Sequence, residues 1–375
     1  MKTVIFKPTY RCNLKCTYCY EKENRDAEHP LEMTKDQACE ALTNLLNCYP
    51  DDFWEIIWHG GEPSIVGLDY IRSVIADIES KFSNIHWAFQ TNGTLLTDEW
   101  LLYFKEKRIS IGSSWDGFDN NITRQSKNFF DLLYRCKKIG TSLGVIYTLT
   151  PENSNNIIKA YQFAKDNKIS LIFNTAFGIN LSVEDHIELA NKLIDLFDYM
   201  CISENAYLHR PFDEIVSFIK GEECFYCEGK NCVGDWFGIH PDGGVFSCGK
   251  PWPDETQLGN VFINKDNLKE TIENSKFRKI IRNVRLQQLE ECKKCKYVIS
   301  CRGRCPFTGF NGINYSKDYA QCAFTKTFYD GCLSVLFKHL ENNTLINSEL
   351  LSAISMSNKI QFKPWKNYKS PLMAI

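Results

Sequence analysis

The stretch Arg11-Cys12-Asn13-Leu14-Lys15-Cys16-Thr17-Tyr18-Cys19-Tyr20 decides the fold that we expect for the whole chain. Its three cysteines follow the apolar run Val4-Ile5-Phe6, so a strand leads directly into a cysteine-bearing loop. Three thiolates this close can share one inorganic centre, and on a four-iron cube they leave one iron open for a small molecule. Zinc is the alternative, but structural zinc takes four protein ligands, and no other Cys or His follows before His29.

Composition narrows the class of protein. The chain has 375 residues, enough for one large domain and a smaller one. A formal net charge of -2 gives no basic excess, so no nucleic-acid partner is expected. The sequence has no apolar run long enough to span a membrane and no signal peptide, which predicts a cytoplasmic protein without a membrane partner. Thiols stay reduced there, so the 17 cysteines favour metal ligands over disulfides.

Strand-like and helix-like runs alternate six times between residue 2 and about residue 200. The expected strands are 2–6, 53–58, 85–89, 109–114, 143–149 and 169–173, and the expected helices are 34–48, 70–78, 99–104, 129–139, 157–165 and 186–196. Such alternation predicts an α/β fold with a parallel sheet. A Rossmann fold is disfavoured because no Gly-x-Gly-x-x-Gly follows a strand. We therefore predict a partial (β/α)6 TIM-like barrel, with its chemistry at the carboxyl ends of the strands.

The composition changes sharply after residue 223, where cysteines, aromatic residues and turn pairs become frequent. We expect a barrel over 1–200, a helical linker over 201–223, a small loop-rich, cysteine-rich domain over 224–325, and a C-terminal helix with a tail over 326–375. A module so rich in loops has little apolar core, so metal clusters are expected to hold it together.

Polar segments follow three of the expected barrel strands. Gly60-Gly61-Glu62 follows the second strand, Gln90 and Asn92 follow the third, and Ser114 ends the fourth. Two glycines let a ligand approach the backbone, and a neighbouring carboxylate accepts from an ammonium group. Each segment taken alone also fits an ordinary turn.

The Cys-x3-Cys-x2-Cys spacing, with Tyr18 before the last cysteine, resembles the radical S-adenosylmethionine (SAM) enzymes. The resemblance implies that Cys12, Cys16 and Cys19 hold a [4Fe–4S] cluster whose open iron binds SAM. It also implies SAM contacts by Tyr18, Gly60, Gly61, Glu62, Gln90, Asn92 and Ser114. No catalytic side chain is assigned.

The later cysteines resemble the SPASM extension of these enzymes, which carries two auxiliary [4Fe–4S] clusters. Their order is Cys232-x15-Cys248, then Cys292-x2-Cys295-x5-Cys301-x3-Cys305, then Cys322. The resemblance implies one cluster on Cys232, Cys248, Cys305 and an upstream cysteine, for which Cys227 fits better than Cys224. The other cluster takes Cys292, Cys295, Cys301 and Cys322. A pair of zinc ribbons is the alternative that bare Cys-x2-Cys spacing allows.

The resemblance implies a SAM-derived 5′-deoxyadenosyl radical that takes a hydrogen from a peptide side chain. We expect maturation of a ribosomally made peptide by a carbon–carbon or thioether cross-link, with a flavodoxin- or ferredoxin-type electron donor. Because the first cluster cysteine is at position 12, we expect leader recognition elsewhere in the chain or on a separate leader-binding protein.

Two alternatives stay open at this point. One is anaerobic sulfatase maturation, the oxidation of Cys or Ser to formylglycine. In that subfamily an acidic residue follows the cysteine that aligns with Cys248, whereas Gly249 and Lys250 follow here. The other is a non-catalytic, zinc-held interaction module, which leaves Gly60-Gly61-Glu62 unexplained.

Overall fold

The structure is a computed structural model that describes residues 1–177, 179–222, 232–305, 307–308 and 319–357. The chain forms two compact units. The first comprises Met1–Trp115, Asn120–Val145 and Cys232–Asn283, and the second comprises Asp116–Asp119, Ile146–Asn231 and Val284–Ile375. Each unit therefore combines segments that are distant in the sequence.

The first unit is built on a parallel sheet, which confirms the predicted α/β class. Its strands β1 (Lys2–Thr9), β2 (Trp54–Gly60), β3 (Ile85–Thr91) and β4 (Ser110–Ser114) pair in chain order. Each strand leads to a covering helix: α2 (Lys35–Asn47), α3 (Leu68–Lys81), α4 (Asp98–Lys107) and α6 (Phe129–Ile139). Two short helices, α1 (Lys22–Arg25) and α5 (Asn120–Thr123), lie in the loops. The parallel strands place their carboxyl ends at one edge, as a TIM-like arrangement requires.

The sheet continues on the other side of β1, which the sequence analysis did not predict. Strand β7 (Trp236–Ile239) pairs with β1 in parallel, and β8 (Gly244–Phe246) and β9 (Gly259–Asn260) add to it in antiparallel fashion. Helices α10 (Cys232–Asp235), α11 (Leu268–Asn274) and the start of α12 (Lys276–Cys292) belong to the same segment. Residues that we had assigned to a separate cysteine-rich domain thus extend the first sheet.

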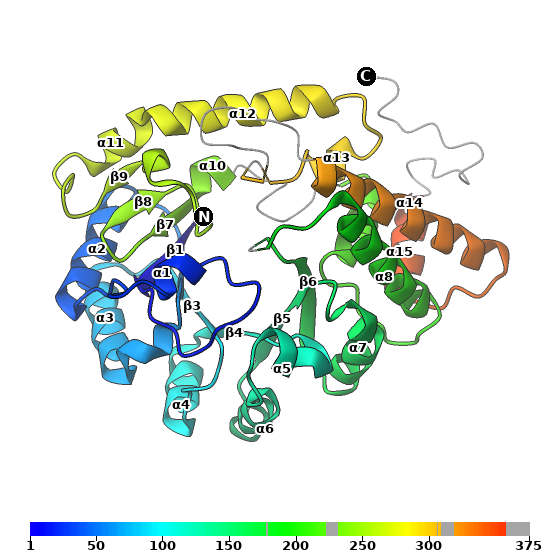
Figure 1. Cartoon of the computed structure of the whole chain (residues 1–375), viewed down its shortest axis with the longest axis horizontal. Coiled ribbons are helices and arrows are strands. Elements are labelled where there is room, and N and C mark those ends of the chain that lie inside the picture. Colours follow the sequence, from blue (N-terminus) through cyan, green and yellow to red (C-terminus); the bar gives the residue numbers. More distant parts are fainter. Residues whose placement is uncertain (178, 223–231, 306, 309–318, 358–375) are drawn as a thin grey trace. The chain divides into compact units, whose positions relative to one another are not determined.

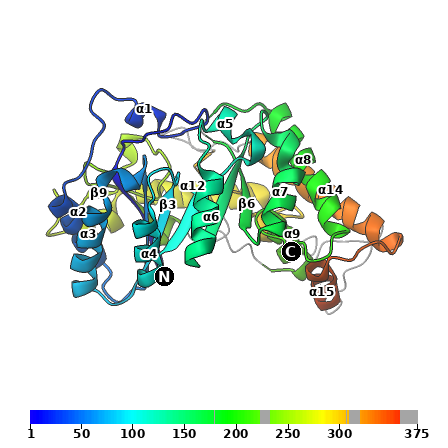
Figure 2. The same ribbon diagram turned by 90° about the horizontal axis from the view of Figure 1, so that it is seen from below.

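Local sequence explains how the covering helices form. Thr34 caps α2, because its hydroxyl accepts from the Gln37 backbone N–H while the Gln37 side chain accepts from the Thr34 N–H. Behind the strands lies an aromatic core in which Trp58 contacts Phe6 at a centroid distance of 5.1 Å and Trp87 at 6.0 Å. Figures 1 and 2 show α2, α3 and α4 along the outer side of these strands.

The second unit contains most of β5 (Leu143–Leu149), β6 (Ser170–Thr175) and mainly helices. The helices are α7 (Ile157–Asp166), α8 (Val183–Cys201), α9 (Phe212–Lys220), α13 (Val298–Cys301), α14 (Tyr319–Glu341) and α15 (Ser348–Ser357). Helix α14 packs along α8, where a Cβ added at Gly331 would lie 2.2 Å from Cδ1 of Ile194. The predicted helix after Cys322 is therefore confirmed.

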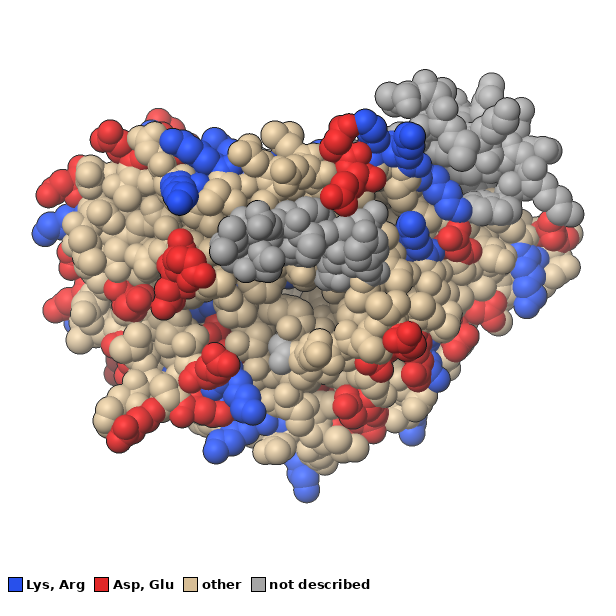
Figure 3. All heavy atoms as spheres, turned by 45° about the horizontal axis from the view of Figure 1, so that its top comes forward, with Lys and Arg blue, Asp and Glu red and all other residues tan. Residues whose placement is uncertain are grey.

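The surface carries no broad field of one charge on the face in Figure 3, where basic and acidic side chains are interspersed. Among the described residues, no helix has the length and apolar character needed to cross a membrane.

Candidate functional site

The cysteine loop begins where β1 ends and carries three partly exposed thiols, those of Cys12, Cys16 and Cys19. Two backbone contacts shape the loop: the Leu14 N–H donates to Sγ of Cys12 at 3.4 Å, and the Cys19 N–H donates to the Cys16 carbonyl at 3.2 Å. Burial raises the pKa of the Cys12 thiol to about 11 and also raises that of Cys19, and the other thiols of the loop add to the effect. A positively charged metal centre would offset this cost of deprotonation, so the donor set fits an iron–sulfur cluster.

Gly60 and Gly61 hold the start of this loop by close backbone approach. The Gly61 N–H donates to the Thr9 carbonyl at 3.0 Å, and the Glu62 N–H donates to the Arg11 carbonyl at 2.7 Å. A Cβ at Gly61 would lie 2.2 Å from the Arg11 oxygen, and Gly60 has a φ of +111°. The expected reason for these glycines was access for a ligand, whereas in the structure the loop backbone itself fills the space.

The Glu62 carboxylate is buried and accepts hydrogen bonds from groups that follow or end the two strands β2 and β3. Oε1 accepts from the Ser64 hydroxyl at 2.6 Å and from the Thr91 hydroxyl at 2.7 Å, and Oε2 accepts from the Asn92 N–H at 2.6 Å. Burial raises the pKa of this carboxyl, and the hydrogen bonds act against that rise. Glu62 thus ties the end of β2 to the end of β3, in addition to any contact with a bound ligand.

Replacing Glu62 with Gln tests this site. We expect weaker SAM binding and a lower melting temperature, because the amide NH2 would face donors and leave at least one buried donor unsatisfied, at a cost of about 1–3 kcal/mol. Ser114→Ala is the control, since it removes one neutral hydrogen bond worth about 1 kcal/mol. Anaerobic calorimetry with SAM and thermal unfolding measure the two effects. Unchanged SAM affinity in Glu62→Gln would contradict the placement.

The remaining predicted SAM contacts of the first unit lie near one another in pairs. The Asn92 amide donates to Oδ1 of Asn13 at 2.8 Å and lies 3.9 Å from Sγ of Cys12, so it borders the cysteine loop. The Gln90 amide donates to the Ser114 hydroxyl at 3.4 Å. The structure therefore brings Asn92 to the predicted cluster and pairs Gln90 with Ser114.

Tyr18 is buried against a residue to which the sequence analysis gave no role. The Arg124 guanidinium, itself buried, donates to the Tyr18 hydroxyl at 2.7 Å, and the Thr17 N–H donates to the Thr123 carbonyl at 2.9 Å. These contacts fix the loop from the side of α5. Sequence spacing gives no sign of them, because the partners are about a hundred residues apart.

A buried polar cluster beside the loop also escaped the sequence analysis. Lys7 is fully buried on β1, and its ammonium lies 2.5 Å from Oε1 of Glu21 and 3.3 Å from Nε2 of His240. Tyr20 stacks on His59 at a centroid distance of 6.4 Å. The centroid of the Tyr20 ring also lies 5.9 Å from the Lys7 ammonium. The available signal was a lysine that directly follows the apolar run Val4-Ile5-Phe6.

The two histidines of this cluster predict acid sensitivity. Burial, with the Lys7 ammonium adding to it, lowers the pKa of His59 to about 4 and that of His240 to about 2. Unfolding returns both to about 6.5, so below that pH the unfolded state binds more protons. The free energy of unfolding should therefore fall between about pH 6.5 and pH 4, by up to about 1.4 kcal/mol per pH unit for each histidine. The contribution of His59 should be the smaller one, because its side chain is partly exposed to solvent. Thermal unfolding at stepped pH measures this slope, and a His59→Gln variant with an unchanged slope would contradict the assignment to His59.

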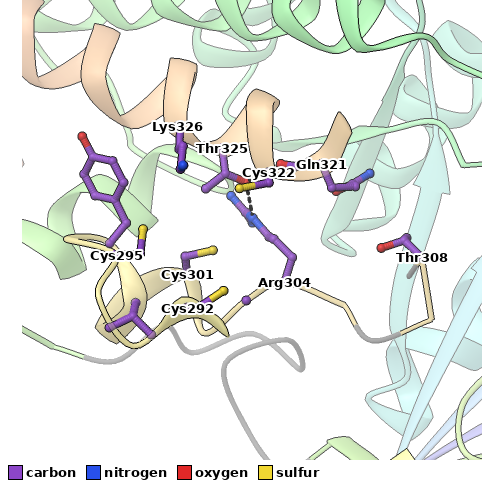
Figure 4. A pocket seen from close by; sticks show the side chains of 12 residues that line it. Cys292, Cys295, Cys301, Arg304, Thr308, Gln321, Cys322, Thr325 and Lys326 are labelled. Carbon is purple, nitrogen blue, oxygen red and sulfur yellow. Dashed lines mark hydrogen bonds between the residues drawn. The ribbon is translucent and has the colours of Figure 1, made fainter. Parts of the chain in front are cut away.

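The second unit contains a cavity lined by four thiols. They come from Cys292 at the end of α12, Cys295 in the following turn, Cys301 at the end of α13 and Cys322 on α14, and Figure 4 shows them around one space. Nowhere in the described residues do three or more His, Cys, Asp or Glu side chains form a site for a single metal ion. Four thiols that line one cavity are the donor set of a [4Fe–4S] cluster.

The other predicted auxiliary ligands are not assembled within one unit. Cys248 follows β8 in the first unit, where its sulfur accepts from Nε1 of Trp252 at 3.1 Å, and Cys305 belongs to the second unit. Cys232 begins α10, but its side chain, together with Cys224 and Cys227, lies outside the described residues. This ligand set stays a prediction.

Gly249, next to Cys248, has no room for a side chain. A Cβ there would lie 2.4 Å from Cγ2 of Ile5 on β1.

Asp116 belongs to the second unit, where its carboxylate accepts a hydrogen bond from the Thr148 N–H at 3.2 Å.

Two family models match this chain, one in each of its two cysteine-bearing regions. The family model described as "Radical SAM superfamily" matches residues 6–164, and the model described as "Iron-sulfur cluster-binding domain" (SPASM) matches residues 227–296. The Cysteine-type anaerobic sulfatase-maturating enzyme of Clostridium perfringens (strain 13) is 25% identical, covering 81% of this chain and 88% of the relative. The Serine-type anaerobic sulfatase-maturating enzyme of Bacteroides thetaiotaomicron is 26% identical over 83% and 85%. The solved structure "Native anSMEcpe with bound AdoMet and Cp18Cys peptide" has a TM-score of 0.74 at 20% identity, covering 96% of this chain and 99% of that one.

Proposed function

Since the chain is a radical SAM enzyme with a C-terminal SPASM domain, we propose that it oxidises a cysteine or serine side chain of a protein substrate to formylglycine. Its cofactors are SAM and three [4Fe–4S] clusters. The observation that carries the proposal is similarity to sulfatase-maturating enzymes of both the cysteine and the serine type over more than four fifths of each chain. A peptide substrate is further supported by a peptide-bound structure of the same fold.

When bound, SAM and the clusters supply a radical that removes a Cβ hydrogen and an acceptor for the electron left on the substrate. We assign the SAM-binding cluster to Cys12, Cys16 and Cys19, and one auxiliary cluster to the four-cysteine cavity. The protein's own part is to hold these groups: Glu62 joins the ends of β2 and β3, and Asn92 borders the cysteine loop. A flavodoxin- or ferredoxin-type donor in the cytoplasm is the partner that we propose for the SAM-binding cluster.

The substrate must also lose a proton. For cysteine, loss of a Cβ hydrogen atom, one electron and the thiol proton leaves a thioaldehyde, which water converts to the aldehyde with release of hydrogen sulfide. The acidic residue that resemblance to the sulfatase-maturating subfamily implies after Cys248 is replaced here by Gly249, and Ile5 occupies the space that its side chain would need. The proton acceptor must therefore come from elsewhere in the chain or from solvent.

The glycine at position 249, in place of an acidic residue, favours a second candidate function, which is the oxidative cross-linking of a ribosomally made peptide. Formation of a carbon–carbon or thioether bond also removes two hydrogens from the substrate, but it leaves no aldehyde. The two candidates share the radical step and differ in the bond that is made after it.

The test is anaerobic incubation with SAM, a reductant and two peptides. One peptide is a sulfatase active-site segment with its target Cys or Ser, and the other is the product of a short reading frame beside this gene. Formylglycine is expected as a product that reacts with a hydrazide probe, and a matched peptide with Ala at the target should stay unchanged. A product that has lost two hydrogens without hydrazide reactivity would replace the first candidate with the second.

A further inference from the structure

A guanidinium group is fixed at the wall of the four-cysteine cavity. Arg304 lines this cavity, and Figure 4 shows its side chain extending among Cys292, Cys301 and Cys322. Its backbone has a φ of +65° and follows Gly303 at +77°, so a left-handed turn directs it there. The Gln288 amide donates to the Arg304 carbonyl at 3.2 Å and holds this turn.

Two side chains orient the guanidinium from behind. Nη1 donates to Oε1 of Glu214 at 3.0 Å, Nη2 lies 2.9 Å from Oε2, and Nε donates to the Thr325 hydroxyl at 2.8 Å. Glu214 on α9 is only 1% exposed and accepts another hydrogen bond from the Tyr329 hydroxyl at 3.2 Å. The guanidinium is therefore held by two hydrogen bonds and by an ion pair with a buried carboxylate, which leaves the positive charge little freedom to move.

The positive end of this pair is the end that faces the thiols. Arg304 lines the cavity, whereas Glu214 is not among its lining residues. The positive charge of the pair therefore lies at the cavity wall, and the negative charge lies behind it.

A purely mechanical role explains the pair less well. The free-energy cost of removing two charges from water is about as large as the free energy gained from their attraction. Well-packed apolar side chains would therefore join α9 to the turn at Arg304 equally well. A charge at the cavity wall, in contrast, acts directly on whatever charge the cavity holds, because the low dielectric of the interior screens it little.

We propose that Arg304 raises the reduction potential of the iron–sulfur cluster bound in the four-cysteine cavity, with Glu214 and Thr325 holding the guanidinium in position. Reduction adds one negative charge to a cluster, and a fixed cation beside it stabilises the reduced form. This inference rests on the assignment of Cys292, Cys295, Cys301 and Cys322 as cluster ligands, not on the identity of the substrate.

The experiment is a redox titration of the reconstituted full-length protein, followed by electron paramagnetic resonance. The expected order of midpoint potentials for this cluster is Glu214→Gln highest, then wild type, then the double variant Arg304→Gln/Glu214→Gln, then Arg304→Gln lowest. Glu214→Gln and Arg304→Gln must shift the potential in opposite directions, because one removes a negative charge and the other a positive one. A role limited to folding predicts no such opposition of sign.

Lys326→Met is the matched control, since Lys326 lines the same cavity but is exposed to solvent and should shift the potential much less than Arg304→Gln. If Arg304→Gln does not hold its cluster, the neutral double variant keeps the hydrogen-bonding shape and must still titrate below wild type. Equal potentials in wild type and the double variant would overturn the proposal. Failure of the underlying ligand assignment is separate: Cys301→Ser would then retain the full iron content and the same resonance signals.

Discussion

A variant in which Cys12, Cys16 and Cys19 are all replaced by alanine will cleave no SAM and will retain about two thirds of the wild-type iron, or about eight of twelve atoms. The loss is complete because all three thiols that we assign to the SAM-binding cluster lie on this one loop. Auxiliary sites elsewhere in the chain keep their own ligands, which accounts for the iron that remains. Iron and sulfide assays and the yield of 5′-deoxyadenosine measure the two effects.

The matched control replaces Cys39, Cys48 and Cys136, three thiols on or at the end of covering helices of the first unit. Free thiols of this kind behave as small apolar side chains, so their loss should cost some stability and no iron. SAM cleavage that persists in the loop variant, or equal iron loss in both variants, would contradict the assignment of the cysteine loop.

Lys7→Met will destabilise the first unit by about 3–5 kcal/mol, because it leaves the Glu21 carboxylate buried without its partner. The reason is burial: Lys7 is fully buried and Glu21 is 2% exposed, with 2.5 Å between ammonium and carboxylate. The double variant Lys7→Met/Glu21→Gln should recover most of this loss, since it removes both charges. Denaturant unfolding of the three proteins measures the effect.

Lys2→Met on the same strand is the matched control. The Lys2 ammonium lies 3.8 Å from Asp52 and 3.7 Å from Asp235, and both carboxylates are well exposed. Such pairs are worth about 0–1 kcal/mol, so this change should be mild. Similar losses for Lys7→Met and Lys2→Met would show that the buried charge pair contributes nothing special to stability.

The sequence was sufficient to predict the six strand–helix repeats and the two cysteine patterns. Alternating hydrophobic periods are local signals, and the spacing in 12–19 and 292–322 lies within short segments. Strand β7 was not predicted, because four residues next to glycines and cysteines give no clear period, and its pairing with β1 joins segments more than two hundred residues apart. Tertiary contact, not local pattern, forms that strand.

The candidate site shows the same limit. The sequence singles out Gly60 and Gly61 as SAM contacts, and that role stays a prediction. Their close packing against the backbone of Thr9–Arg11 is visible only in the fold. Arg304 lies within a visible cysteine pattern, between Cys301 and Cys305, yet its partner Glu214 is ninety residues away and nothing in the spacing links them. A single sequence gives little indication of which distant polar residue will pair with a buried charge.

The most direct test of the proposed function follows hydrogen from substrate to cofactor. The substrate is the sulfatase-derived peptide with both Cβ hydrogens of its target residue replaced by deuterium, incubated anaerobically with the enzyme, SAM and a reductant. We expect deuterium to appear in 5′-deoxyadenosine and the same peptide to gain an aldehyde at the target residue. An aldehyde or other product formed while the 5′-deoxyadenosine stays free of deuterium would contradict this expectation.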